Sequence, residues 1–271
     1  MPELTPSAWQ GPRPDEGPPR RHGPVARVAV LSDVHGNVPA LAAVLAEPDV
    51  ADADLVVVCG DLTWGPEPEQ TYALIAGLGD RAVAVRGNAD RYVTELAAGT
   101  RTARTPRETW MPDRHSPEAL AFLRALPFSV VITVAGLGDV LCCHGSPRSD
   151  NELVTPGTPA DRFARLSADV TPKVLVSGHT HLQFDRRVGD RRSVNPGSVG
   201  LPYHLGEAGT AYWALLGPDV ALRATHYDPD AAVARTHASG DPAAERVTML
   251  LRQPPRPEEI VADAESRVFA D

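Results

Sequence analysis

Five short apolar runs, each closed by polar residues, most strongly constrain the fold of this 271-residue chain. They read VARVAVLSD (25–33), ADLVVVCGD (53–61), DRAVAVRGN (80–88), GDVLCCHG (138–145) and PKVLVSGHTH (172–181). Continuous apolar runs of about five residues are typical of strands that are buried on both faces. Because loops converge at the carboxyl ends of strands in an open α/β sheet, we expect the closing polar residues to meet at one site.

Helical patterns separate the early runs, and hairpin patterns separate the later ones. Helices are predicted at 39–47, 70–78 and 116–126, which gives the early chain a β-α-β-α-β order and a largely parallel sheet. Hairpins with Gly-containing turns are predicted at 128–144, 182–195 and 210–227. We expect these hairpins to form a second sheet, mixed or antiparallel, packed on the first. Residues 229–252 are predicted to be helical.

The ends of the chain and its overall charge narrow the class of protein. Residues 1–24 hold seven prolines together with Gly and Arg, which predicts a disordered extension before a single domain at 25–252. Residues 253–271 are predicted to be a polar tail. The net charge of −9 argues against a nucleic-acid partner, and no stretch is long enough for a membrane span. Three cysteines in apolar runs indicate reduced thiols and a cytoplasmic location, while a homo-oligomer is left open.

Seven side chains at the ends of the five runs have the chemistry of metal ligands. They are Asp33, His35, Asp61, Asn88, His144, His179 and His181. A single Asp or His after a strand is usually a turn residue or a helix cap, but seven at five successive strand ends favour a shared site. Two carboxylates, four imidazoles and one amide suffice for two divalent cations if one Asp bridges them. Two such cations attract phosphate and can clamp a phosphoryl group.

The ordered set of motifs resembles the calcineurin-like metallophosphoesterase superfamily over roughly residues 25–228. The motifs are Asp33-x-His35-Gly36, Gly60-Asp61, Gly87-Asn88, His144-Gly145 and Gly178-His179-x-His181. The stretches GNAD and NPGSVG (195–200) are most similar to the compact prokaryotic YfcE-type phosphodiesterases. The resemblance implies an α/β fold, a four-layer α/β/β/α sandwich of two packed mixed sheets flanked by helices. It also implies a metal-dependent hydrolase acting on a small phosphoester substrate, with a phosphodiesterase favoured.

The resemblance further implies a role for each motif residue. The first metal would be bound by Asp33, His35 and His181, the second by Asn88, His144 and His179, with Asp61 bridging the two. Manganese is the expected metal, with iron, zinc or nickel as alternatives, and a metal-bridging hydroxide would attack phosphorus directly. Asp61, Asn88 and His144 would activate this hydroxide and position the phosphate, while Asn37 would order the first loop without binding a metal.

One position departs from the family pattern. Many members have a His after Gly-Asn that helps to protonate the leaving group, whereas this chain has Ala89 followed by Asp90. General acid catalysis contributes a factor of about 10²–10⁴, so its loss favours substrates with low-pKa leaving groups such as aryl diesters. Asp90, Arg148 and His204 are candidates for contacts with the leaving group or the phosphate, and His115 is a further candidate acid. For both histidines an ordinary surface or loop role is favoured over this one, and Arg148 fits a solvated charge or a structural ion pair at least as well.

Other functions fit parts of the pattern. A catalytically weak scaffold or binding protein of the same fold would explain the missing motif His, but all seven ligands are present. A phosphomonoesterase or protein phosphatase is a second alternative, and a nuclease is disfavoured by the acidic balance of the chain. Trp64 and Tyr203 fit either a substrate cleft or core packing.

Overall fold

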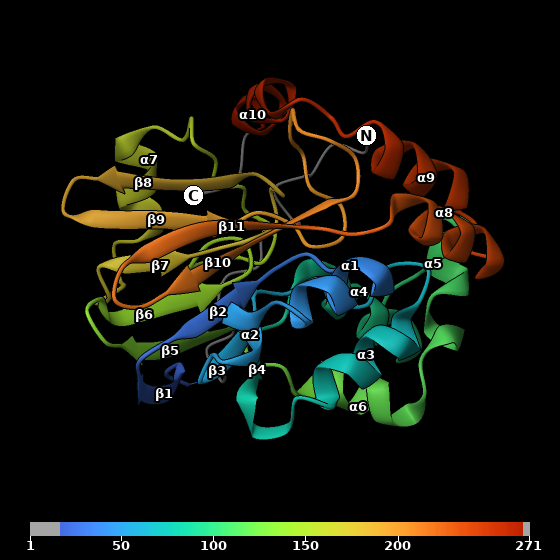
Figure 1. Ribbon diagram of the computed structural model, residues 1–271, viewed down its shortest axis with the longest axis horizontal. Helices are drawn as coiled ribbons and strands as arrows, with labels where there is room; N and C mark the ends of the chain where they lie inside the picture. Colours follow the sequence, from blue (N-terminus) through green and yellow to red (C-terminus); the bar gives the residue numbers. More distant parts are fainter. Residues whose placement is uncertain (1–16, 268–271) are drawn as a thin grey trace.

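Two mixed β-sheets lie face to face in the computed structural model, which describes residues 17–267 (Figure 1). The six-stranded sheet has the order β1 (Arg20–Val25), β5 (Ser129–Val134), β6 (Gly138–Cys143), β7 (Val174–Val176), β9 (Arg191–Pro196), β8 (Gln183–Val188). The five-stranded sheet has the order β11 (Val220–His226), β10 (Thr210–Leu216), β2 (Val28–Leu31), β3 (Leu55–Val58), β4 (Ala82–Ala84). Helices lie on the outer faces, so the expected four-layer sandwich is confirmed.

The covering helices are short and most begin near a proline. Their bounds are α1 (Val38–Leu45), α2 (Pro48–Ala51), α3 (Pro68–Ala76), α4 (Asn88–Ala97), α5 (Pro106–Trp110), α6 (Pro117–Ala125), α7 (Ala160–Leu166), α8 (Pro229–Ala238), α9 (Ala244–Arg252) and α10 (Pro257–Ser266), with 3₁₀-helices η2 (Gly79–Arg81) and η3 (Pro112–Arg114). Proline suits the first helical turn, where an N–H would have no partner within the helix. The helices expected in the first half are confirmed as α1, α3 and α6, and those near the C-terminus as α8 and α9. Within residues 17–267, every helix lacks the length or the apolar character needed to cross a membrane.

Alternate residues of β2 face two different cores, which explains its uniformly apolar sequence. Val28 and Val30 belong to the core between the two sheets, whereas Ala29 and Leu31 belong to the core beneath α1, α3 and α6. A third core lies between the six-stranded sheet and α7. Full burial of an aliphatic side chain is worth roughly 1.5–3 kcal/mol, so a strand buried on both faces firmly anchors the loop that follows it.

One expected hairpin lies in the other sheet. The hairpins β5–β6 and β8–β9 are confirmed in the six-stranded sheet. The hairpin β10–β11, expected beside them, instead extends the five-stranded sheet, because β10 pairs antiparallel with β2 through Leu215 and Ala29. Since six of the seven residues of β10 are buried, this strand needs a central position between two covered faces. The parallel order β2, β3 and β4 is as predicted.

The described parts of both terminal segments contain secondary structure that the sequence did not indicate. Residues 20–24, expected to be disordered, belong to β1, which pairs in parallel with the edge of the sheet at β5. The tail expected at 253–271 contains α10, which packs Ile260 and Val261 on the third core and buries Ala264. Its few apolar residues are spaced to fall on one helical face, a pattern that the surrounding acidic residues obscure. The remaining parts of these two expectations, residues 1–16 and 268–271, lie outside the described residues.

Candidate metal centre

Five of the candidate ligands share a strained backbone conformation. φ is +53° at Asp33, +48° at His35, +54° at Asp61, +66° at His179 and +58° at His181. Across residues 17–267, these are the non-glycine residues with positive φ. Asp and His enter this left-handed region more readily than most residues, yet each instance costs of order 1–3 kcal/mol. Strain concentrated at the ends of β2, β3 and β7 indicates loops that are shaped to aim these side chains.

Hydrogen bonds between neighbouring loops hold this shape. The N–H of Asp33 donates to the carbonyl of Gly60 at 3.0 Å, and the N–H of His35 donates to the carbonyl of Asp61 at 3.0 Å. The carbonyl of Asp33 accepts the hydroxyl of Ser198 at 2.7 Å and the N–H of Gly200 at 3.0 Å. The NPGSVG stretch therefore braces the loop that follows β2.

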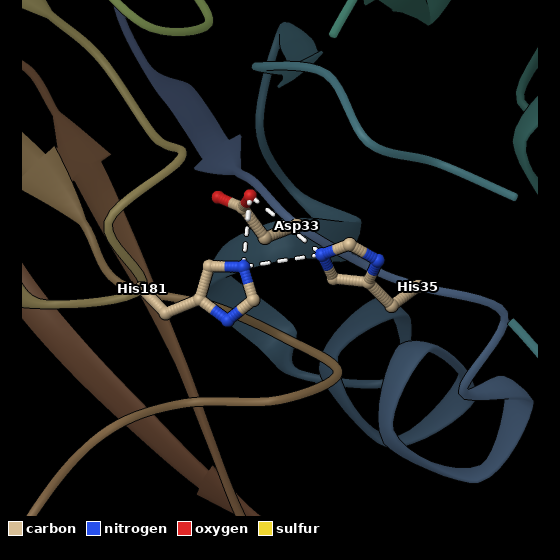
Figure 2. A group of neighbouring side chains, drawn as sticks. All are labelled: Asp33, His35 and His181. Carbon is tan, nitrogen blue, oxygen red and sulfur yellow. Dashed lines mark hydrogen bonds and ion pairs between the residues drawn. The ribbon is translucent and has the colours of Figure 1, made fainter. Parts of the chain in front are cut away.

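Asp33, His35 and His181 form a first cluster (Figure 2). Nε2 of His35 lies 3.1 Å from Nε2 of His181. Oδ1 of Asp33 lies 3.2 Å from the same His181 nitrogen and 3.9 Å from that of His35. The loop after β2 supplies Asp33 and His35, and the segment between β7 and β8 supplies His181, so both sheets contribute. Imidazole and carboxylate donors this close together suit a divalent transition metal.

Asp61, His144 and His179 form a second cluster, and Asn88 joins it. Nε2 of His144 lies 3.1 Å from Nδ1 of His179 and 3.4 Å from Oδ1 of Asp61. The side-chain oxygen of Asn88, the first residue of α4, lies 3.0 Å from the same nitrogen of His144. These four residues follow four different strands, β3, β4, β6 and β7, whose carboxyl ends converge here.

Asp61 directs one carboxylate oxygen toward each cluster. Oδ1 lies 3.4 Å from Nε2 of His144, and Oδ2 lies 3.7 Å from Nε2 of His35. The structure thus brings all seven residues of the sequence hypothesis into one connected group. The side chains of His35 and His181 remain 10% and 9% exposed, whereas that of His144 has no exposed surface. His179 and Asn88 are also only partly buried, so solvent reaches members of both clusters.

In each of the four imidazoles, the ring nitrogen that faces away from the clusters hydrogen-bonds to a backbone carbonyl. The pairs are His35 Nδ1 with Trp64 (3.1 Å), His144 Nδ1 with Cys59 (2.7 Å), His179 Nε2 with Asn151 (3.2 Å) and His181 Nδ1 with Leu201 (2.6 Å). A carbonyl oxygen only accepts, so each outward nitrogen carries the hydrogen. In a neutral ring the inward nitrogen then has a free lone pair, which is the arrangement that metal-binding histidines use.

Protonation is uneven within each histidine pair. Burial and the charge of His181 lower the pKa of His35 to about 4, and burial and the charge of His144 lower the pKa of His179 to about 4. Burial opposes charge on His144 as well, but the Asp61 carboxylate outweighs it and raises the pKa of His144 to about 10. A similar balance raises the pKa of His181. In the metal-free protein the raised pKa of His144 therefore leaves an extra proton in the second cluster at neutral pH, where a cation would otherwise lie, and the raised pKa of His181 shifts the first cluster in the same direction.

Two further observations fit cations at this place. Among the described residues, buried Oδ1 of Asp33 has no hydrogen bond of normal geometry and faces the His181 nitrogen at 3.2 Å, a position that a cation would satisfy better. The backbone also approaches the carboxylates closely: a Cβ on Gly178 would lie 2.6 Å from Oδ2 of Asp33, and one on Gly87 would lie 2.1 Å from Oδ1 of Asp61. These two positions accept only glycine without displacing the carboxylates.

Asn37 lies outside the ligand group and hydrogen-bonds to residues on both sides of the first loop. Its Oδ1 accepts the N–H of Ala40 at 3.2 Å and caps α1. Its Nδ2 donates to the carbonyl of Gly200 at 3.0 Å and to the hydroxyl of Tyr227 at 3.3 Å. One side chain thus joins the start of α1 to the NPGSVG stretch.

The buried side chain of Asp90 accepts hydrogen bonds from the backbone of two ligand loops. Its Oδ2 accepts the N–H groups of Asp61 and Gly87, each at 2.9 Å, and its Oδ1 accepts the N–H of Leu62 at 3.0 Å. Burial and the nearby Asp61 charge raise the pKa of Asp90 to about 7 despite these donors. Because main-chain N–H groups occupy both oxygens, this geometry favours a role for Asp90 in positioning the loops, and its contact with the leaving group or the phosphate stays a prediction.

The other candidate residues belong to local networks of their own. Arg148 forms an ion pair with Glu152 on the loop after β6. Nδ1 of His204 accepts the N–H of Gly206 at 2.9 Å. His115 is buried, with Nδ1 on a backbone carbonyl at 2.9 Å. These contacts are of the structural kind that the sequence left as the alternative.

The sequence indicated one supporting residue in part and missed one supporting helix. Tyr203, for which the sequence left a substrate cleft or core packing open, stacks its ring on that of His181, with centroids 4.8 Å apart and an interplanar angle of 21°. Helix α4 was not predicted at all, although Asp90 stands three residues after Gly87 and accepts its N–H. An acidic residue at this third helical position is the signal that could have marked the start of the helix.

A family model for the calcineurin-like phosphoesterase superfamily domain matches residues 27–215. The chain therefore belongs to the calcineurin-like phosphoesterase superfamily, and its fold and donor set agree with a superfamily that uses divalent metals.

Several solved structures are similar to this chain, and the first two below share its fold. A metallophosphoesterase from Sphaerobacter thermophilus is 24% identical with a TM-score of 0.68, covering 84% of this chain and 98% of its own. The hypothetical protein PH1004 from Pyrococcus horikoshii OT3 is 21% identical with a TM-score of 0.71, covering 84% and 99%. YfcE, a phosphoesterase from E. coli, is 20% identical with a TM-score of 0.46, covering 74% and 100%. The search of curated proteins gave no match.

Proposed function

We propose that the protein is a phosphodiesterase that requires two divalent cations and acts on a small phosphorylated molecule. Asp61 carries this proposal, because its two oxygens face His144 and His35, which belong to separate clusters. When bound, the two cations would supply Lewis-acid activation of water and of the phosphoryl oxygens. Manganese is the first candidate, because carboxylate, amide and imidazole donors together suit this group of metals.

The residues of the chain would prepare the site for an anionic substrate. Two divalent cations carry four positive charges, and the carboxylates of Asp33 and Asp61 contribute two negative charges, which leaves a net charge of +2. A site with this charge attracts phosphate even though the whole chain has a net charge of −9. Backbone carbonyls hold the four imidazoles in place, so their orientation requires no rearrangement when substrate binds.

Ala89 supports a preference for substrates with good leaving groups. Its methyl side chain is buried and has no proton to donate, at the position where many superfamily members have a His. Aryl phosphodiesters leave as weakly basic phenolates and need little protonation, so they are the substrates we expect to be hydrolysed fastest. Cys59, Cys142 and Cys143 are free and buried, which supports a reducing compartment, and we propose a cytoplasmic location.

The proposal is tested by hydrolysis of bis(p-nitrophenyl) phosphate and p-nitrophenyl phosphate by purified protein loaded with Mn²⁺. We expect metal-dependent hydrolysis, faster for the diester, and loss of at least about 10³-fold in Asp61→Asn. The matched control is Asp80→Asn, an exposed carboxylate on η2, which should behave as wild type.

Two results would overturn the proposal in different ways. Faster hydrolysis of the monoester would show that the protein is a phosphomonoesterase and not a phosphodiesterase. If the wild type were as inactive as Asp61→Asn with both substrates and several metals, the protein would be a binding scaffold and not an enzyme.

A further inference from the structure

Two adjacent residues of α4 hold the loop that follows β6. Arg91 donates to both carboxylate oxygens of Asp150, from Nε at 2.8 Å and from Nη2 at 2.9 Å, and this ion pair is buried. The next residue, Tyr92, donates its hydroxyl to Oδ1 of Asn151 at 2.9 Å. Two consecutive residues of the helix thus bind two consecutive residues of the loop, which fixes the register between them.

The loop held in this way contacts a candidate metal ligand. The carbonyl of Asn151 accepts Nε2–H of His179 at 3.2 Å, so it is the group that orients this ring. The opposite nitrogen of His179, Nδ1, lies 3.1 Å from Nε2 of His144 within the second cluster. A displacement of Asn151 would therefore turn or release the ring whose inward nitrogen faces the second cation site.

The same helix also carries the other side of the second cluster. Asn88 is its first residue, and the N–H of Ala89 donates to Oδ1 of Asp61 at 2.9 Å. One turn later, Tyr92 reaches across to the loop that orients His179. Helix α4 thus connects Asn88, Asp61 and His179, which follow three different strands.

The ring of Tyr92 is held independently of its hydroxyl. The guanidinium of Arg101 lies 3.9 Å from the ring centroid, that of Arg91 lies 4.9 Å away, and Trp64 makes an edge contact with centroids 6.3 Å apart. Substitution by Phe would keep these contacts and remove only the hydrogen bond to Asn151. The hydroxyl can therefore be tested without removing the side chain that fills this space.

We propose that Tyr92 is a positioning residue for the second cation: through Asn151 it sets the orientation of His179 and so raises the affinity of this site. The proposal rests on the proposed two-metal function. Groups that orient a metal ligand change metal affinity by about 10–100-fold when removed. The first cluster has its own carbonyl contacts at Trp64 and Leu201, so its affinity does not depend on the Tyr92 hydroxyl.

The first test is a stepwise titration of metal-free protein with Mn²⁺, in which calorimetry measures the affinity of each binding step. We expect Tyr92→Phe to weaken the second binding step about 10–100-fold and to leave the first step unchanged. Asn151→Ala should have a similar effect, and the double variant should be little worse than either single variant. The matched control is Tyr72→Phe, whose ring lies against Phe122 on another part of the helical layer.

A second measurement needs no cation. In metal-free protein labelled at the histidine rings, the Nε2–H proton of His179 should exchange with solvent about 10-fold faster in Tyr92→Phe than in wild type. Unchanged exchange, or equal weakening of both metal-binding steps, would overturn the proposal. If wild type bound only one cation, the two-metal function would fail, and the exchange measurement would still decide the role of Tyr92.

Discussion

The backbone N–H of Ala89 lies 2.9 Å from Oδ1 of Asp61 and donates a hydrogen bond to it. Position 89 therefore serves the carboxylate between the two clusters through its main chain, which every residue except proline provides. The side chain of Ala89 does not contribute to this hydrogen bond, because its methyl group makes no polar contact. The main-chain and side-chain contributions of position 89 can thus be separated by substitution.

Ala89→His should restore a proton donor without removing the hydrogen bond to Asp61. We expect kcat/KM to rise by about 10²-fold for alkyl diesters, whose leaving groups need protonation, and to change little for aryl diesters. The measurement is the dependence of kcat/KM on leaving-group pKa in a series of phosphodiesters. Ala89→Gln is the control, because it adds a polar side chain of similar length that cannot transfer a proton. An equal effect of both substitutions on all leaving groups would contradict the argument.

Asp90→Asn should destabilise the protein by about 1–3 kcal/mol. An amide offers one acceptor oxygen in place of two, so at least one of the N–H groups of Asp61, Leu62 and Gly87 would face an NH₂ group in a buried place. The free energy of unfolding, measured in denaturant on metal-free protein, provides the test. Asp80→Asn, in an exposed position, should remain within about 0.5 kcal/mol of wild type.

Metal binding should release at least about one proton at pH 7, which comes from His144. Because its pKa is raised to about 10, His144 is protonated in the metal-free protein and must lose this proton to bind a cation, and the raised pKa of His181 adds to the release. The apparent affinity should therefore increase with pH from 7 towards 10. Calorimetry in buffers of different ionisation enthalpy measures the proton count, and a count near zero would rule out a protonated His144.

The raised pKa of His144 also affects the stability of the metal-free protein. Because its folded-state pKa of about 10 exceeds the ordinary value of 6.5, its contribution is complete below about pH 6.5 and is lost as the pH rises towards 10. We expect metal-free protein to unfold at lower denaturant concentrations at pH 9.5 than at pH 6.5. His144→Gln should reduce this difference between the two pH values.

Helix α10 should contribute to stability through Glu265. This side chain accepts the hydroxyls of Thr155 and Thr158 at 2.6 and 2.8 Å, next to the loop that approaches His179. Glu265→Ala should lower the free energy of unfolding by about 1–3 kcal/mol, because it leaves two buried hydroxyls without this acceptor. Glu259→Ala, on the exposed face of the same helix, is the matched control. Equal stability of the two variants would show that α10 is only loosely attached.

The strands that precede the ligands were predictable because their own apolar residues indicate that they are buried. In β2 and β3 nearly every residue is buried, so apolar runs alone identify them, and the ligands follow at once in the chain. Strand β1 has the sequence RRHGPV, which resembles a disordered segment. It forms a strand because the edge of β5 offers backbone partners, and that is a tertiary effect.

The residues that support the ligands were not predictable for a related reason. Arg91 and Asp150 are 59 positions apart, and nothing near either residue in the sequence indicates that they meet. A buried ion pair has no periodicity and depends on how α4 and the loop after β6 approach each other. Ligands follow from local patterns at strand ends, whereas the contacts that orient them follow from the packed fold.

The positive φ angles at five ligand positions limit how this site can change over time. Glycine and asparagine adopt this conformation most easily, and β-branched residues adopt it least, so few replacements at Asp33, Asp61 or His181 avoid steric strain. A descendant that no longer needed its cations would more readily acquire Gly or Asn at these positions than Val or Thr. The loops would then keep the same backbone conformation, and they would still identify the position of the former metal site after the ligands had been replaced.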